Sequence, residues 1–221
     1  MMAYTRTHGD LVAPAATGTA ISLRRGDRVT GDVVTGGGLV SGLDQPAVQI
    51  GGRVDPSGNA PQLAQCAAAA CRVGQRYEEM HGLAVTPGFQ LPPIIVPRGA
   101  TQDINLPPGE VVIDTPYIRL RSYAKLRLVG DASTRAIVRT GQMNVGVAAH
   151  IQAQGIPPEQ IVFVVTGPAK LGKYASVSGS ILATRTISVG REGVVDGGIF
   201  AGAGIRVYAY AHLNPYPFVG W

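Results

Sequence analysis

The sequence predicts a three-sided β-solenoid, and three observations support this. The segments 171–181 (LGKYASVSGSI) and 189–199 (VGREGVVDGGI) match at a fixed spacing of 18 residues. Apolar residues alternate along both copies and glycines recur at matching places, which is typical of stacked windings. Thirty glycines and sixteen prolines, with only 15% charged residues, suit turn-rich β-structure. At about 3.3 Å per extended residue, 18 residues measure about 60 Å around, which is enough for three sides and a packed interior.

The repeat predicts which residues stack between windings. Each predicted pair joins equivalent positions: Leu171 with Val189, Gly172 with Gly190, Val177 with Val195, Gly179 with Gly197 and Ile181 with Ile199. A weaker third copy places Val207 and Leu213 after Val189 and Val195. These pairs define the predicted winding of about 18 residues.

Upstream copies have longer spacings. Residues 137–151 match 163–177 at a spacing of 26, and residues 120–126 precede 145–151 by 25. The eight additional residues fit a loop around Gly155 and Pro158, because the two prolines there cannot donate a backbone hydrogen bond. Near the N-terminus, residues 23–34 superpose on 171–182 without a gap. We therefore expect five or six windings that are discontinuous in the sequence.

One α-helix is expected, at 62–80 within an insertion at 60–82. Asn59 and Pro61 are start signals and Gly82 is a stop signal. An apolar stripe of mostly small residues recurs at spacings of three and four: Leu63, Cys66, Ala67, Ala70, Gly74 and Tyr77. Such a stripe suits close packing on a flat sheet. The proline-rich stretch that follows predicts irregular chain with short strands.

The expected partner of the helix is an outward apolar column on the solenoid. If Ile137, Phe163, Ile181 and Ile199 point inward, the residue after each points outward, because side chains alternate along a strand. The predicted helix-packing face is therefore Val138, Val164, Leu182 and Phe200. Left bare, this column would be an exposed apolar patch.

Charge and cysteine content leave several interpretations open. The net charge is +5, with arginines spread along the chain. They form either a surface for a polyanion or ordinary solvated strand positions, and the absence of a basic block favours the second. Cys66 and Cys71 lie about 140° apart on the predicted helix, which disfavours a disulfide and suggests small buried thiols. The chain contains neither a secretory apolar segment nor a membrane-spanning run.

No catalytic, cofactor or metal site is predicted. The fourteen acidic residues and four histidines are scattered, and no winding places two carboxylates two residues apart on a strand. A β-helix that acts as a polysaccharide lyase or hydrolase would need clustered acids, or an acid with an arginine or lysine, on one face. The tripeptide Arg-Gly-Asp at Arg25–Asp27 could suggest integrin binding, but it is interpreted as a chance occurrence.

Several motifs of the sequence resemble those of a known family. The motifs GDVVTGGGLVSG (31–42), EQIVFVVTG (159–167), SGSILA (178–183) and ISVG (187–190) are similar to those of the ice-binding-protein-like β-solenoid family, over about 17–214. That family is related to bacterial choice-of-anchor and adhesin-associated surface solenoids. The resemblance implies a right-handed parallel β-helix with one α-helix packed alongside. It also implies secretion or surface display, and ice binding in some members.

This chain departs from the family in having no secretion leader and no Thr/Ser-rich face, so a cytosolic location stays open. When the predicted windings are aligned, one column of threonines remains. It is the candidate face for ice or another ligand and consists of Thr140, Thr166 and Thr184, flanked by Thr186. Threonines also stack in β-helices simply because β-branched side chains pack well there.

The leading sequence-based hypothesis is a non-enzymatic, self-assembling structural protein. The whole chain, 1–221, is expected to be one solenoid domain with an N-terminal arm (1–16) and a C-terminal tail (214–221). Terminal windings expose unpaired backbone groups, so head-to-tail contacts could build filaments. The candidate assembly residues are Tyr4, Tyr216, Phe218 and Trp221. The alternatives are an ice-binding or adhesive surface protein and, third, an enzyme acting on an anionic polysaccharide.

Overall fold

The computed structural model describes residues 6–7, 11–13, 19–22, 28–29, 33–35, 39–41, 43–44, 48–55 and 74–214. The chain forms two compact units, residues 1–75 and 76–221. The predicted assembly residues Tyr4, Tyr216, Phe218 and Trp221 lie outside the described residues, as do Cys66 and Cys71. Each unit contains parallel β-sheets.

The first unit contains short parallel strands in three sheets. They are β1 (Arg6–Thr7), β2 (Leu11–Ala13), β3 (Thr19–Ser22), β4 (Arg28–Val29), β5 (Val33–Thr35), β6 (Leu39–Ser41), β7 (Gln49–Ile50) and β8 (Val54–Asp55). The sheet orders are β1-β4-β7, β2-β5-β8 and β3-β6. β1 and β2, inside the predicted N-terminal arm, pair with β4 and β5 of the same chain. β4 and β5 lie where the gap-free match of 23–34 to 171–182 places them.

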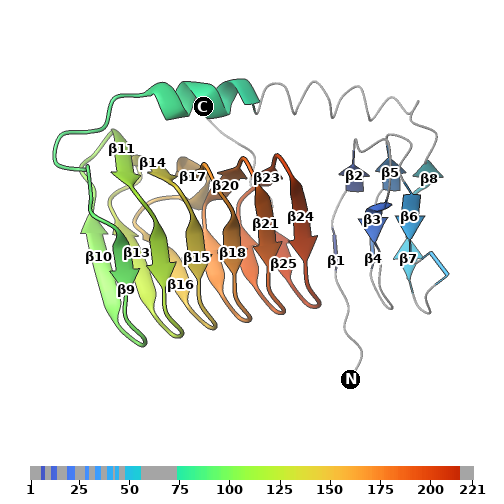
Figure 1. Ribbon diagram of the computed structural model, residues 1–221. Helices are drawn as coiled ribbons and strands as arrows, with labels where there is room; N and C mark the ends of the chain where they lie inside the picture. The colour runs from blue at the N-terminus through green and yellow to red at the C-terminus, as the bar shows by residue number, and fades with distance from the viewer. Residues whose placement is uncertain are drawn as a thin grey trace. The chain divides into compact units, whose positions relative to one another are not determined.

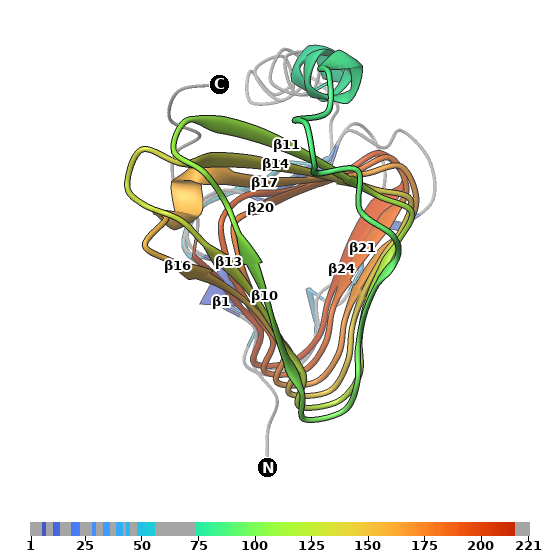
Figure 2. The same ribbon diagram turned by 90° about the vertical axis from the view of Figure 1, so that its left-hand side faces the viewer.

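The second unit is a stack of windings with three sides, as predicted (Figures 1 and 2). Its three parallel sheets, numbered here in chain order, have the following strands. Sheet 1 contains β9 (Ile94–Val96), β12 (Ile118–Leu120), β15 (Met143–Val145), β18 (Ala169–Leu171), β21 (Thr186–Val189) and β24 (Gly204–Val207). Sheet 2 contains β10 (Thr101–Asn105), β13 (Lys125–Val129), β16 (His150–Gln154), β19 (Ser176–Ser178), β22 (Val194–Asp196) and β25 (His212–Asn214). Sheet 3 contains β11 (Glu110–Thr115), β14 (Arg135–Thr140), β17 (Ile161–Val165), β20 (Ser180–Ala183) and β23 (Ile199–Ala201).

The windings differ in length. Leu171 pairs with Val189, Val177 with Val195 and Ile181 with Ile199, so the predicted 18-residue spacing is confirmed for the last windings. The earlier windings are longer, as the upstream matches predicted: equivalent residues of sheet 1 lie 24 to 26 apart, and Leu120 with Val145 and Val145 with Leu171 pair at the predicted spacings of 25 and 26. The eight additional residues lie between Ile151 and Val162, in the segment where the prolines predicted a loop, and this segment contains the 3₁₀ turn η1 (Pro158–Gln160). Corner loops thus absorb the length variation while the sheets stay in register.

The core fills the triangle between the three sheets. It is built from aliphatic side chains with one central aromatic ring, and its largest fully buried members include Phe163, Ile113, Ile118, Leu120, Leu126, Ile151 and Ile181. Parallel strands covered on the inside give this alternation of buried and outward residues. Burying apolar surface at about 25 cal/mol per Å² is the main stabilising contribution.

The predicted inward and outward assignments need one correction. Phe163 and Ile181 point into the core and pair with each other. However, Phe163 pairs with Val138, and Ile137 pairs with Val162. Val138 is therefore a core residue and Ile137 faces outward, the reverse of the prediction. The alignment at a spacing of 26 is wrong in sheet 3, where the spacing is 25. The additional residue lies in the next corner, at Thr166–Pro168, so the spacing of 26 holds again in sheet 1.

The described part of the helix covers residues 74–82, and its end at Gly82 agrees with the prediction. It runs outside sheet 3 (Figure 2). Met80 is buried, and the guanidinium of Arg139 on β14 donates to the carbonyl oxygens of His81 and Leu83. A cation at the C-terminal end of a helix satisfies carbonyl groups that lack an intrahelical partner. These contacts hold the last helical turn next to β14.

The corner between sheets 1 and 2 has an unusual backbone. One residue per winding adopts a left-handed conformation with φ between 51° and 71°: Gly99, Tyr123, Ala148, Tyr174, Glu192 and Tyr210. Only Gly99 does so without cost, since the others pay about 1–2 kcal/mol each. Hydrogen bonds between windings compensate, for example from Tyr123 N to the carbonyl of Val147 at 2.9 Å. This corner is the narrow vertex at the bottom of Figure 2.

Candidate binding surfaces

The structure does not bring the four predicted threonines together on one face. Thr140 is buried, and its hydroxyl donates to the carbonyl of Gln142 at 3.2 Å. Thr166 and Thr184 are exposed and lie on adjacent windings at the corner between sheets 3 and 1, joined by a 2.6 Å hydrogen bond from Thr184 Oγ1 to the carbonyl of Thr166. Thr186 begins β21 on sheet 1. Two threonines at a corner do not make a flat contact surface.

The predicted helix-packing column is partly outward. Val164 and Leu182 point away from the core and are nevertheless buried, whereas the outward Phe200 is 37% exposed. Ile137 and Val162, which the prediction missed, are also outward and buried. Sheet 3 is therefore covered over much of its outer surface. Open faces suited to contacting a large ligand are found on sheets 1 and 2.

The outer face of sheet 2 is polar and its charges are largely compensated. The guanidinium of Arg127 makes two hydrogen bonds to the carboxylate of Asp103, at 2.7 and 2.6 Å, and they hold the pKa of Asp103 below its usual value. The side-chain amide of Asn214 donates to Asp196 at 2.7 Å. His150 lies 2.7 Å from the hydroxyl of Ser176, and partial burial, together with Lys125, lowers the pKa of His150. At neutral pH this face therefore has little net charge.

The outer face of sheet 1 is basic. Its central outward column, one residue from each winding, reads Ile95, Arg119, Asn144, Lys170, Ser188 and Arg206. None of the strands of this sheet contains an acidic residue. Sheets 1 and 2 thus offer two adjacent open faces with different chemistry.

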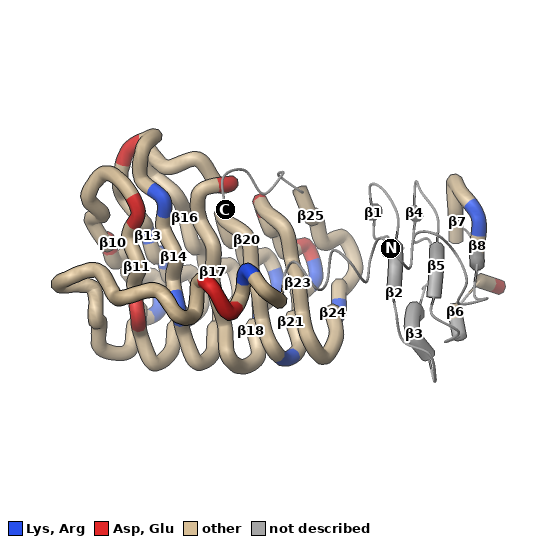
Figure 3. The backbone as a smooth tube through the Cα atoms, turned by 90° about the horizontal axis from the view of Figure 1, so that it is seen from above, with Lys and Arg blue, Asp and Glu red and all other residues tan. Residues whose placement is uncertain are grey.

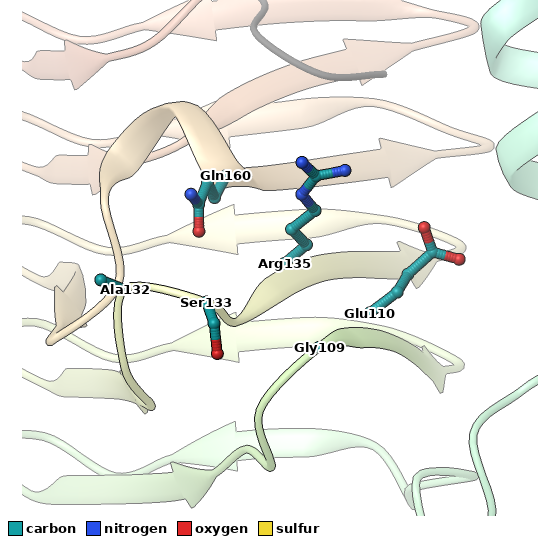
Figure 4. A pocket seen from close by; sticks show the side chains of 6 residues that line it. All are labelled: Gly109, Glu110, Ala132, Ser133, Arg135 and Gln160. Atoms are coloured by element: carbon teal, nitrogen blue, oxygen red, sulfur yellow. The ribbon is translucent and has the colours of Figure 1, made fainter.

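Two shallow pockets open on the surface of the second unit, and neither holds a pair of acids. The larger, of about 420 Å³, is lined by Glu110, Arg135, Gln160 and neighbouring small residues. In Figure 4 its side chains are spread over successive windings and do not converge on one point. The second, of about 360 Å³, contains Asp114, which makes a 3.4 Å ion pair with Arg139. Glycoside hydrolysis needs two carboxyl groups about 5–9.5 Å apart.

Acidic residues of the second unit are scattered over its surface (Figure 3). Asp131, at a corner, has its pKa lowered by hydrogen bonds from Ser133, through both its hydroxyl and its backbone N–H, and then from Thr134. Among the described residues, no three histidine, cysteine or acidic side chains are grouped as a metal site would require. Within the same described residues, no helix is long and apolar enough to cross a membrane.

No family model matches the sequence, and neither does any curated protein. Solved structures do match. An ice-binding protein from an Arctic yeast aligns with a TM-score of 0.63 at 14% identity, over 99% of this chain and 92% of that one. One from the Antarctic ascomycete Antarctomyces psychrotrophicus aligns at 0.56 and 17% identity, over 95% and 92%. One from an Antarctic biological consortium aligns at 0.51 and 16%, over 96% and 84%. The chain therefore has the β-solenoid fold of ice-binding proteins.

Proposed function

We propose that this protein is a non-enzymatic β-solenoid that binds ice. The observation that carries the proposal is the likeness of fold over nearly the whole chain to proteins described as ice-binding. Fold alone does not determine function, so the surface must also suit the ligand. Neither of the two pockets described above holds the paired carboxylates that glycoside hydrolysis needs, which argues against polysaccharide hydrolysis at these pockets. A protein that binds ice would act outside the cell, which agrees with the secretion or surface display that the sequence resemblance implies.

The outer face of sheet 2 is the surface that we propose to contact ice. An ice surface is an uncharged, two-dimensional array of hydrogen-bond donors and acceptors. Outward residues of a sheet also form a regular array, about 4.7–4.9 Å apart between strands and about 6.6 Å apart along them. On sheet 2 these positions are mostly polar, and Asp103 and Arg127 neutralise each other. Sheet 1 lacks this compensation, and much of the outer surface of sheet 3 is buried.

A bulky side chain on sheet 2 tests this assignment. Ser178 is an outward, half-buried residue of β19 that pairs with Asp196. Ser178→Tyr should reduce thermal hysteresis and inhibition of ice recrystallisation to buffer level, because a protruding ring prevents flat contact. Ser188→Tyr is the matched control, since Ser188 is a half-buried outward serine on sheet 1. Thr166→Tyr tests the exposed corner threonines in the same assay.

The possible outcomes distinguish whether the protein binds ice from which of its outer surfaces contacts the ice. An inactive wild-type protein would show that ice binding is wrong. Loss of activity in Ser188→Tyr or Thr166→Tyr, with Ser178→Tyr unaffected, would move the contact surface away from sheet 2. Melting temperatures of all variants should stay close to that of the wild type, because each substituted residue points outward.

Filament formation has less support at the first winding of the second unit. β11 is the edge strand of sheet 3, and residues 86–91 form hydrogen bonds with the edge that does not face β14. Thr86 N donates to Val112 O at 3.0 Å, and Leu91 N donates to Asp114 O at 2.8 Å. Prolines flank β9 and β10, and prolines lack the N–H that an added strand would need. We therefore expect sedimentation velocity to show one species across protein concentrations. A sedimentation coefficient that rises with concentration would restore the filament hypothesis.

A further inference from the structure

We propose that sheet 1 and its corner with sheet 2 form a binding surface for an acidic polysaccharide. The first observation is charge. Arg119, Lys170 and Arg206 are exposed in the middle of β12, β18 and β24. Exposed basic residues continue onto the corner: Arg98, Arg121, Lys173 and Arg191. The strands of sheet 1 and the corner turns that follow them, all of which the structure describes, contain one acidic residue, Glu192. Its carboxylate pairs with Arg191 at 3.1 Å.

The second observation is a column of tyrosines at the corner. Tyr123, Tyr174 and Tyr210 occupy left-handed positions there, each four residues after Arg119, Lys170 and Arg206. A basic side chain lies over each ring, with Arg98, Lys173 and Arg191 at 5.6, 4.4 and 5.3 Å from the respective ring centroids. Tyr123 and Tyr174 are still 55% and 43% exposed. The backbone accepts left-handed strain at this corner, which is the narrow vertex in Figure 2.

The third observation is alternation. The pairs Arg119 with Tyr123, Lys170 with Tyr174 and Arg206 with Tyr210 come from every second winding. The windings between them carry smaller or uncharged groups at the central position, such as Asn144. Adjacent strands are about 4.7–4.9 Å apart, so one cation in the central column, and one tyrosine with a basic side chain over its ring at the corner, recur about every 9.5 Å along the stack. The surface is therefore a linear array with a long, regular step.

This step selects the ligand. An extended polysaccharide whose repeating unit is two sugars, with one carboxylate in each repeat, presents one anion and one apolar sugar face per two rings. Sugar rings pack on aromatic side chains, and carboxylates pair with arginine and lysine. Nucleic acid fits less well, because it carries a phosphate on every nucleotide, about 3.4 Å apart per strand in a duplex. An anionic membrane has no linear repeat that would require alternation.

Binding of hyaluronan oligosaccharides, which have one carboxylate per disaccharide, tests the proposal by titration calorimetry at low salt. The triple variant Arg119→Asn, Lys170→Asn and Arg206→Asn copies the neutral Asn144 and should bind at least about tenfold more weakly, with each lost contact contributing modestly. The charge-matched control Arg53→Asn, Arg76→Asn and Arg135→Asn removes three exposed basic residues that do not belong to sheet 1 or this corner, and it should bind like the wild type. Tyr123→Ala with Tyr174→Ala should also weaken binding, and Ala148 shows that alanine fits this backbone position.

Each alternative result overturns the assignment. Equal loss in both triple variants would mean that net charge, and not this surface, attracts the ligand. Tighter binding to single-stranded DNA or to anionic phospholipid vesicles than to hyaluronan would assign the surface to those partners. Absence of binding to hyaluronan by the wild-type protein at low salt would remove the proposal. Unchanged melting temperatures confirm that the variants are folded.

Discussion

Replacing Phe163 by Ala is expected to destabilise the second unit by about 3–5 kcal/mol, the usual cost of truncating a buried phenylalanine. The ring is fully buried in the middle of the stack and pairs with Val138 on one side and Ile181 on the other. Each winding of a solenoid is held by its neighbours, so a cavity here weakens the windings on both sides. Thermal unfolding followed by calorimetry would measure the loss.

The control is Phe200→Ala. Phe200 lies on β23 in the column of residues that point away from the core, and it is 37% exposed. Its truncation should cost much less than that of Phe163. Similar losses in the two variants would contradict the inward assignment of Phe163 and with it the packing of the triangular core.

Replacing Gly179 by Val is expected to destabilise the second unit by about 2–6 kcal/mol, since backbone strain and overpacking each contribute about 1–3 kcal/mol. Gly179 has φ = 124°, a conformation that side chains with a Cβ rarely adopt. An added Cβ would also lie 2.8 Å from Ile161 Cγ2 and 2.9 Å from the carbonyl oxygen of Ile161. Both effects act at the turn between β19 and β20. Denaturant titration would give the change in free energy of unfolding.

Gly204→Val separates the two contributions. Gly204 has φ = 150°, but a Cβ added there would meet no atom within 4 Å. This variant should therefore lose less stability than Gly179→Val. Equal losses would show that the clash with Ile161 is relieved by a small shift of the neighbouring winding and that only the backbone strain matters.

The sequence predicted the stacking of the last windings well because those windings have equal lengths. Leu171, Val177 and Ile181 each pair with the residue 18 positions later, as the repeat indicates. The prediction failed at Val138 because windings of 25 and 26 residues differ by one residue, and a sequence match does not reveal which corner holds it. A shift of one residue turns every side chain of a strand to the opposite face.

The candidate threonine column failed for the same reason. Thr140 pairs with Val165 and not with Thr166, which leaves Thr140 inside and Thr166 at the corner. The regular face that we propose for ice is also difficult to recognise in the sequence. Its outward residues differ from winding to winding, and what they share is position on sheet 2.

The sequence by itself determined that this chain winds into stacked parallel strands, because alternating apolar residues at a fixed period can be buried together only in that way. Tertiary structure decided which side chains share an outer surface. Arg119, Lys170 and Arg206 are separated by unequal lengths of chain, yet the corner loops absorb the difference and place them in one column. Hydrogen bonding between strands keeps the register of the sheets whatever the length of the loops, so a binding surface on this fold becomes visible only when the windings are stacked.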